Sequence, residues 1–461
     1  MFDRTTYIER RNNLKKLLKV GLVILPGNND SPMSYKDNAF PFVQDSTFLY
    51  FFGLNTPGLI GVMDLDNDID YIFGKEYTLD DIIWMGPQKS FKLQAQEVGI
   101  EKFLEIETLK DFLKQSKNQN ILFLDQYRDD NILTLSSLLN IDPFQFKNFT
   151  SRKLAIAISK LRNIKTTEEI KEIEKAVNIT RLMHLEAFKI AKPGIKEYEI
   201  TAAIEKIAKE HNCLTSFHTI CTKHGEILHN HSQNNVLSSG DILLLDCGAR
   251  LESGYCGDMT TVIPVSGTFS NIQKEFYQLL IKMFEKAETL IKPGVKYLDV
   301  HIEVCKELTR GLIEKNILKG DVDEIVANGA HALFFPHGLG HMLGLDVHDM
   351  ENFGEDIVGY GEGLEKSQLF GLKSLRLARV LEEGHVFTIE PGIYFIPELI
   401  KRWENENKFT QYINYDEVKK YINLGGMRYE GDFVITKDGA RRLGEKMPKS
   451  FAEVEKIKSQ F

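Results

Sequence analysis

Four acidic residues lie in or beside segments that are otherwise built from apolar and β-branched residues. Asp246 follows "DILLL", and Asp258 comes shortly before "TTVIPV", which the pattern predicts to be the hairpin partner of that strand. Glu390 follows "HVFTI" and precedes a Pro-Gly turn, and Glu430 lies in the predicted strand "GGMRYEGDFVIT". A buried carboxylate is stable only beside a cation or hydrogen-bond donors. These strands can therefore pack into a core only if something balances their negative charge.

A candidate partner for the acids is the segment "HGLGHMLGLDVHD", which contains three of the chain's 12 histidines: His337, His341 and His348. Several carboxylates with one imidazole form an oxygen-rich ligand set that suits Mn²⁺ or a similar divalent ion. Four acids and one histidine exceed what one ion needs, which favours two ions that share bridging carboxylates. Two such ions polarise a carbonyl group and generate a hydroxide nucleophile. The segment lacks the H-E-x-x-H pattern and so excludes a zinc-peptidase helix.

Length and composition exclude several classes of protein. The chain has 461 residues, which indicates two or three domains, and 43% of them are apolar, as in a soluble globular protein. The net charge of −9 argues against a nucleic-acid partner. Five cysteines without a C-x-x-C pair predict reduced thiols in the cytoplasm. We expect no membrane association, because no apolar run approaches the roughly eighteen residues of a membrane span.

The N-terminal part alternates between short strand-like and helical segments, which predicts an α/β domain. The expected buried strands are "VGLVILPG", "STFLYFFGL", "LIGVMDL" and "ILFLD". A long helix then begins at Thr166 or Thr167, either of which can cap it, and ends at Pro193-Gly194. We place the boundary before this helix, which gives an N-terminal domain over 1–160 and a second domain over 161–461.

The second domain contains an internal repeat. "AKPGIKEYEITAAIEKI" at Ala191 returns as "IKPGVKYLDVHIEVCKE" at Ile291, and each copy places a Lys-Pro-Gly turn between two helices. This favours a duplicated α/β half over coincidence. A duplicated domain would build its site from both halves.

The ordered segments "LLLDCGARLESGYCGDMTT", "HGLGHMLGLDVHD", "TIEPGIY" and "GGMRYEGDFVIT" resemble those of the pita-bread metallopeptidases. That family includes methionine aminopeptidase, aminopeptidase P and prolidase. The first domain is similar to the N-terminal domain of the latter two, most clearly at "FVQDSTFLYFFGLNTPGLIGVMD". The resemblance implies an α/β fold with a creatinase-like N-terminal domain and a pseudo-symmetric catalytic domain.

The resemblance also implies roles for individual residues. Asp258 and Glu430 would bridge two divalent metal ions, with Mn²⁺ as the expected metal. The full implied ligand set is Asp246, Asp258, His341, Glu390 and Glu430. Glu390 would also accept a proton from a bridging water. His348 would stabilise the tetrahedral intermediate, and His337 would position the substrate and shuttle protons.

The implied substrate is a di- or oligopeptide with an Xaa-Pro bond, because prolidase and aminopeptidase P are specialised for this bond. Arg376 stands where prolidases carry an arginine for the terminal carboxylate, and His229 matches a histidine of the same pocket. Arg428 is assigned to substrate binding as well. Trp84 matches a tryptophan that prolidases supply from the partner subunit, which implies a homodimer.

Three functions remain open at this stage. The first is an Xaa-Pro dipeptidase, favoured by Arg376, Trp84 and the long insertion after Glu390; the second is an Xaa-Pro aminopeptidase that acts on longer peptides. The third, a non-catalytic binding module, is disfavoured because every implied ligand is present. Two of the substrate assignments also have structural alternatives: Arg376 could pack on Glu382 or Glu383 at the surface, and Trp84 could be a core residue.

Overall fold

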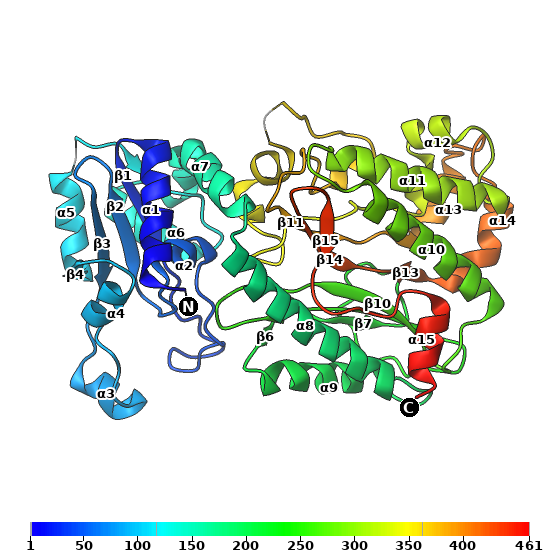
Figure 1. The fold of residues 1–461 in the computed structure, drawn as a ribbon, viewed down its shortest axis with the longest axis horizontal. Coiled ribbons are helices and arrows are strands. Elements are labelled where there is room, and N and C mark those ends of the chain that lie inside the picture. Colours follow the sequence, from blue (N-terminus) through cyan, green and yellow to red (C-terminus); the bar gives the residue numbers. More distant parts are fainter. Residues whose placement is uncertain (1, 117, 362, 461) are drawn as a thin grey trace. The chain divides into compact units, whose positions relative to one another are not determined.

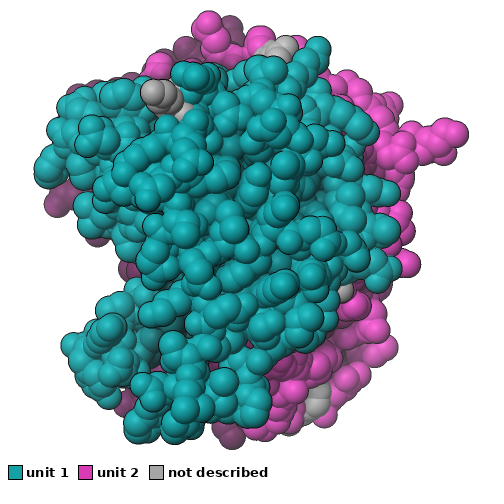
Figure 2. Space-filling model, turned by 90° about the vertical axis from the view of Figure 1, so that its left-hand side faces the viewer, with its two compact units in different colours: residues 1–162, 350–357 teal, residues 163–349, 358–461 magenta. Residues whose placement is uncertain are grey.

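The computed structural model describes residues 2–116, 118–361 and 363–460. Contacts within the chain define two compact units, coloured separately in Figure 2. Unit 1 comprises residues 1–162 with 350–357, and unit 2 comprises 163–349 with 358–461. The predicted domain limits, 1–160 and 161–461, stay a prediction, since this division assigns residues 350–357 to unit 1.

Unit 1 is built on a five-stranded mixed sheet (Figure 1). Its strands, in spatial order, are β4 (Lys102–Glu105), β3 (Ile69–Gly74), β2 (Ile60–Asp64), β1 (Leu22–Pro26) and β5 (Ile121–Leu122). The helices are α1 (Arg4–Leu18), α2 (Ser46–Phe52), α3 (Leu79–Met85), α4 (Phe91–Glu97), α5 (Leu109–Gln115), α6 (Asp129–Leu139) and α7 (Arg152–Asn163). Apolar residues of β1, β2 and β3 pack on α5 and α6 to form one core.

One of the strands expected in unit 1 is a helix instead. The segment "STFLYFFGL" forms α2, although its aromatic and β-branched residues favour a strand. The side chain of Asp45 accepts a hydrogen bond from the Phe48 N–H and caps the helix, and Gly53 ends it with a φ of 65°. All seven residues of α2 are buried, so the segment shows no polar face that would reveal the helical period.

The repeat predicted for unit 2 is confirmed. The Lys-Pro-Gly turns join α8 (Thr167–Ile190) to α9 (Glu197–Glu210) and α10 (Asn271–Leu290) to α11 (Tyr297–Glu314). The two turns are held alike, because the Gly194 N–H donates to the Leu237 carbonyl and the Gly294 N–H donates to the Leu381 carbonyl, each at 2.8 Å. The two halves thus share a backbone design, with a helix pair in each half (Figure 1).

The strands of unit 2 form several small antiparallel sheets. Their members are β6 (Leu214–Thr215) with β9 (Ala249–Arg250); β10 (Met259–Pro264), β8 (Ile242–Cys247) and β7 (Ile220–Thr222); β11 (Val386–Ile389), β14 (Gly431–Ile435) and β15 (Ala440–Arg442); and β12 (Gly392–Tyr394) with β13 (Gly426–Arg428). The predicted hairpin of β8 and β10 is confirmed, with Asp246 opposite Thr260. Glu430 lies between β13 and β14, not within a strand, because the chain changes partner there from β12 to β11.

The remaining helices of unit 2 lie in its C-terminal half. They are α12 (Val322–Asn328), α13 (Pro397–Asn405), α14 (Tyr415–Val418) and α15 (Phe451–Lys458). Among the helices that the structure describes, none combines the length and apolarity that crossing a membrane requires.

A buried arginine ties α1 to the rest of unit 1. The Arg11 guanidinium donates to Asp70 on β3 at 2.8 Å, to the Phe51 carbonyl at 2.9 Å and to the Val98 carbonyl at 2.9 Å. A buried cation is stable only when its donors are satisfied, and here one side chain connects α1, α2, β3 and the end of α4.

We expect Arg11→Met to lower the free energy of unfolding of unit 1 by about 3–5 kcal/mol, because Asp70 would keep only Lys15, at 2.9 Å, and two buried carbonyl groups would lose their donor. Arg4→Met is the matched control, since the Arg4–Glu101 ion pair is more than half exposed and should contribute little. Urea unfolding followed by circular dichroism measures both variants. Equal destabilisation by the two substitutions would contradict the role of Arg11.

Candidate metal centre

The four acids predicted from the sequence reach one place from four different segments. Asp246 belongs to β8, Asp258 directly precedes β10, Glu390 directly follows β11, and Glu430 joins β13 to β14. Backbone hydrogen bonds fix these positions, since the Glu430 N–H donates to the Thr260 carbonyl on β10 at 3.0 Å. Strands and strand ends of both halves of unit 2 therefore bring their carboxylates to a common site.

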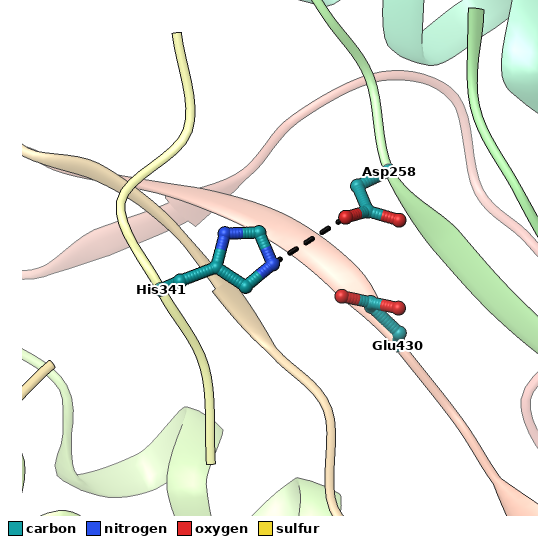
Figure 3. A group of neighbouring side chains, drawn as sticks. All are labelled: Asp258, His341 and Glu430. Atoms are coloured by element: carbon teal, nitrogen blue, oxygen red, sulfur yellow. Dashed lines mark ion pairs between the residues drawn. The ribbon is translucent and has the colours of Figure 1, made fainter. Parts of the chain in front are cut away.

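His341 reaches the same place from the loop after His337. Its N–H donates to the Thr388 hydroxyl at 3.2 Å, and the Thr388 N–H donates back to the His341 carbonyl at 3.0 Å. The imidazole Nε2 lies 3.4 Å from Asp258 Oδ2 and 3.7 Å from Glu390 Oε1. Asp258, His341 and Glu430 place one ligand atom each within 4.8 Å of one another (Figure 3).

Burial strongly perturbs these carboxylates. Desolvation raises the pKa of Asp258 well above its usual value, and the charge of Asp246 raises it further. The pKa of Glu430 is also raised well above its usual value, by burial and then by Asp258. Burial raises the pKa of Glu390 too, although His341 and Arg428 oppose the shift. Several like charges in one desolvated site require a strong positive charge to stay ionised together.

The residues present fit divalent metal ions. Among the described residues, Asp246 Oδ1 and Asp258 Oδ1 are buried side-chain oxygens that have no hydrogen-bond partner. Buried oxygens without donors are costly unless they bind a cation. Carboxylate oxygens with one imidazole nitrogen are also the donor set that hard divalent ions such as Mn²⁺ accept.

Arg428 provides part of the positive charge beside the acids. Its guanidinium donates to Asp246 Oδ2 at 2.5 Å and to the Thr260 hydroxyl at 3.1 Å, and Thr260 in turn donates to Glu430 Oε2 at 2.7 Å. Desolvation lowers the pKa of Arg428, but Tyr394, Asp246 and Glu390 outweigh it, so that the pKa lies well above its usual value. Arg428, predicted to bind substrate, thus orients Asp246 directly and Glu430 through the Thr260 hydroxyl.

His337 sits in a hydrogen-bond network that the sequence did not reveal. Its Nδ1 lies 2.8 Å from the Gly338 carbonyl, which can only accept, so this nitrogen carries the proton. Its Nε2 then accepts from the Tyr394 hydroxyl at 2.8 Å, and that hydroxyl accepts from Arg428 at 3.0 Å. Burial, followed by the charge of Arg428, lowers the pKa of His337 to about 3, which keeps the imidazole neutral near pH 7.

A cavity of about 310 Å³ gathers the predicted site residues. Its lining includes all five predicted ligands, both remaining histidines of the 337–349 segment, and His229, Arg376 and Arg428. The arginine that faces Glu382 is Arg379, at 3.6 Å, whereas Arg376 lines the cavity. Trp84 does not line it; this residue belongs to α3 of unit 1 and is 87% exposed, so it is not a core residue.

The cavity also contains residues that sequence reasoning missed. His218 and His231 line it, with ring centroids 4.7 Å apart, and Phe217 lies beside them in the lining. Tyr394, whose hydroxyl forms a hydrogen bond with His337, lies in β12, shortly after Glu390. The only available signal was their proximity in sequence to His229 and Glu390, which does not distinguish them from other neighbours.

Comparison with known proteins agrees with this geometry. Residues 171–437 match the Metallopeptidase family M24, and residues 7–123 match the Aminopeptidase P, N-terminal domain. The chain is 29% identical to an Xaa-Pro aminopeptidase of Escherichia coli (strain K12), over 99% of this chain and 98% of that protein. It is 30% identical to an Xaa-Pro dipeptidase of Homo sapiens, over 98% of this chain and 92% of that protein.

Solved structures show the same two-domain architecture. Proline aminopeptidase P II from Yersinia pestis superposes with a TM-score of 0.83 at 26% identity, over 100% of both chains. Aminopeptidase P from E. coli with the inhibitor Pro-Leu gives a TM-score of 0.80 at 27% identity, over 100% of this chain and 99% of that one. The predicted α/β fold class, with an N-terminal domain before a pita-bread domain, is confirmed. The chain belongs to metallopeptidase family M24.

Proposed function

We propose that this protein hydrolyses Xaa-Pro peptide bonds with the help of divalent metal ions, and that its main activity is that of an Xaa-Pro dipeptidase. The observation that carries the proposal is the single cavity in which Asp258, His341 and Glu430 converge and Arg376 faces the same space. Relatives named Xaa-Pro dipeptidase and Xaa-Pro aminopeptidase match the chain about equally well, and both act on bonds before proline by name.

We infer two metal ions, with Mn²⁺ as the native metal. Asp246, Asp258, His341, Glu390 and Glu430 would hold them, with Asp258 and Glu430 shared between the two ions. The unpartnered oxygens of Asp246 and Asp258 support this assignment. When bound, divalent ions polarise the scissile carbonyl group and lower the pKa of water to near neutrality.

The chain's own residues would then carry the proton and orient the substrate. Glu390 accepts the proton of the attacking water, because its carboxylate lines the cavity beside the other proposed ligands. His348 stabilises the negative charge that develops on the carbonyl oxygen. The neutral His337, fixed by Tyr394 and the Gly338 carbonyl, positions the peptide and passes protons.

The specificity for dipeptides would depend on Arg376, with His229 and Arg428 as further substrate-binding residues. A guanidinium binds a carboxylate in a bidentate manner, and only a dipeptide places its terminal carboxylate directly after proline. An Xaa-Pro aminopeptidase would leave this end of the cavity open for longer peptides. A non-catalytic binding module is the remote alternative, and the presence of all ligands and histidines in one cavity argues against it.

We further propose a homodimer in which Trp84 acts on the partner's site, and a cytoplasmic location. α3 stands apart from the sheet of unit 1 (Figure 1), and its Leu79, Ile83 and Trp84 side chains are each more than 60% exposed. Exposed apolar side chains on one helix favour an interface. A monomeric mass in sedimentation equilibrium would contradict the dimer.

The proposed cytoplasmic location is supported by the cysteines. All five are buried and form no disulfide, as a reducing compartment allows.

The first test compares hydrolysis of Ala-Pro and Ala-Pro-Ala, with and without added Mn²⁺. We expect Mn²⁺-dependent cleavage of the dipeptide and little cleavage of the tripeptide, because Arg376 binds the free carboxylate after proline. Efficient cleavage of the tripeptide at Ala-Pro would identify an aminopeptidase. Failure to cleave either peptide with Mn²⁺, Co²⁺, Zn²⁺ or Fe²⁺ would overturn the proposed activity.

Asp258→Asn and Glu390→Ala should each abolish turnover and reduce the bound metal. Each substitution removes a proposed ligand, and Glu390→Ala also removes the proton acceptor. Glu383→Ala is the matched control, since Glu383 is an exposed acid seven residues before Glu390. Metal content by plasma emission spectrometry and kcat are measured on all three variants. Normal metal content in Asp258→Asn would exclude the assignment of that ligand.

Arg376→Ala should raise KM for Ala-Pro by roughly 10- to 100-fold and leave tripeptide cleavage nearly unchanged. A charge-assisted hydrogen bond to a carboxylate contributes about 1.5–3 kcal/mol, which corresponds to this range. Arg379→Ala serves as a control, because that arginine lies near Glu382 and the Val358 carbonyl. An equal loss on dipeptides and tripeptides would show that Arg376 supports the fold and does not read the carboxylate.

A further inference from the structure

Beside the candidate site, unit 2 contains a fully buried ion pair that the proposed reaction does not use. Lys165 Nζ donates to Asp349 Oδ2 at 2.9 Å, and each side chain is only 1% exposed. Asp349 immediately follows His348, whose ring lies 4.0 Å from the ring of His341. The pair therefore adjoins, along the chain, the histidine that the proposed function places at the carbonyl oxygen.

Asp349 shapes the loop between these two histidines. Its Oδ1 accepts a hydrogen bond from the Asp346 N–H at 3.3 Å, and its own N–H donates to the Met342 carbonyl at 2.9 Å. Its Oδ2 packs so closely on Gly344 that a Cβ there would lie 2.6 Å away. Asp349 thus holds residues 342–349 in one conformation, through its backbone N–H at Met342 and through its carboxylate at Asp346 and Gly344.

Lys165 connects this loop to the strand that leads to Glu390. The Lys165 N–H donates to the Gly384 carbonyl at 2.9 Å, and β11 begins two residues later at Val386. The loop contacts the same strand, since the Leu343 N–H donates to the Val386 carbonyl at 3.0 Å. Lys165 therefore joins the two segments, because its ammonium group binds the loop of His348 and its backbone N–H binds the residues that lead into the strand of Glu390.

Stability alone does not explain this pair. Transferring two charges from water into a protein interior has a large desolvation penalty, and well-packed apolar residues of similar volume are often equally stable or more so. A buried ion pair does, however, fix one geometry, because any other arrangement leaves a charge unpaired. Its position next to His348 makes that geometry relevant to the reaction.

We propose that Lys165 and Asp349 are positioning residues that set the orientation of His348 toward the substrate carbonyl group. The proposal rests on the proposed function for its kinetic consequence, but not for its structural one. Misplacing a catalytic group by about 1 Å lowers the rate by roughly 10²-fold. The pair should consequently affect kcat more than KM or metal binding, because neither residue lines the cavity.

The test uses the full-length, metal-loaded protein with Asp349→Asn, Lys165→Met and the double variant K165M/D349N. Each single variant breaks the buried ion pair and should lower Tm. The double variant removes both charges, so its Tm should recover toward that of the wild type. Its kcat should nonetheless stay about 10- to 100-fold below the wild-type value, with KM and metal content unchanged. Recovery of kcat together with Tm would overturn the proposal.

The matched control is Asp70→Asn, which removes the carboxylate that pairs with the buried Arg11 in unit 1 at 2.8 Å. It should lower Tm but leave kcat at the wild-type value. If kcat falls in proportion to Tm in both Asp70→Asn and Asp349→Asn, the Lys165–Asp349 pair is merely structural and the proposal fails.

A second measurement is independent of activity. In protein labelled with ¹⁵N-histidine, the ring resonances of His348 are assigned by their loss in His348→Gln. We expect them to shift or split in K165M/D349N and to stay unchanged in Asp70→Asn. Unchanged His348 resonances in the double variant would overturn the proposal. If the wild type cleaves neither Ala-Pro nor Ala-Pro-Ala, the proposed function fails, whereas this spectrum still tests the pair.

Discussion

The repulsion among the carboxylates buried in one cavity is the constraint on which the rest of the site depends. Burial and the neighbouring acids raise the pKa of Asp258 and Glu430 and so favour their protonated forms, while hydrogen-bond donors beside them orient the acids. Arg428 donates to Asp246, and Thr260 donates to Glu430. One arginine cannot balance four acids, and two carboxylate oxygens still lack donors. The fold therefore gathers carboxylates that are costly to bury at a place where a divalent cation would stabilise them, so that part of the free energy of metal binding would stabilise the folded chain.

The duplicated architecture explains how acids from distant segments meet. Each half of unit 2 supplies a helix pair with a Lys-Pro-Gly turn and strands that carry acids near their ends. β8 and β10 of the first half deliver Asp246 and Asp258, while β11 and the β13–β14 connection deliver Glu390 and Glu430. The hydrogen bond from the Glu430 N–H to the Thr260 carbonyl joins the halves at the site itself. A core made from only one half would hold only two of the four acids.

The parts of the fold and site that were predictable are those with a local signal. An acid after an apolar strand and a histidine between glycines each break a pattern, so the acids and the three histidines could be singled out together as candidates, whereas their individual roles came from the family resemblance. α2 could not, because a segment buried on all sides has no polar face and its aromatic residues imitate a strand. The strand change at Glu430 and the Tyr394–His337 contact depend on pairing between distant residues, which no local pattern encodes.

The histidine segment shows how neighbours give chemically identical side chains different surroundings. His341 is fixed by Thr388 on β11 and faces Asp258. His337 is held neutral, with its proton on Nδ1, by the Gly338 carbonyl and Tyr394. His348 lies against His341, and the residue after it is drawn into the interior by Lys165. The segment's glycines allow these backbone approaches: a Cβ at Gly340 would meet the Thr388 carbonyl, and one at Gly344 would meet Asp349. The glycines thus permit the close contacts that give each imidazole its own surroundings.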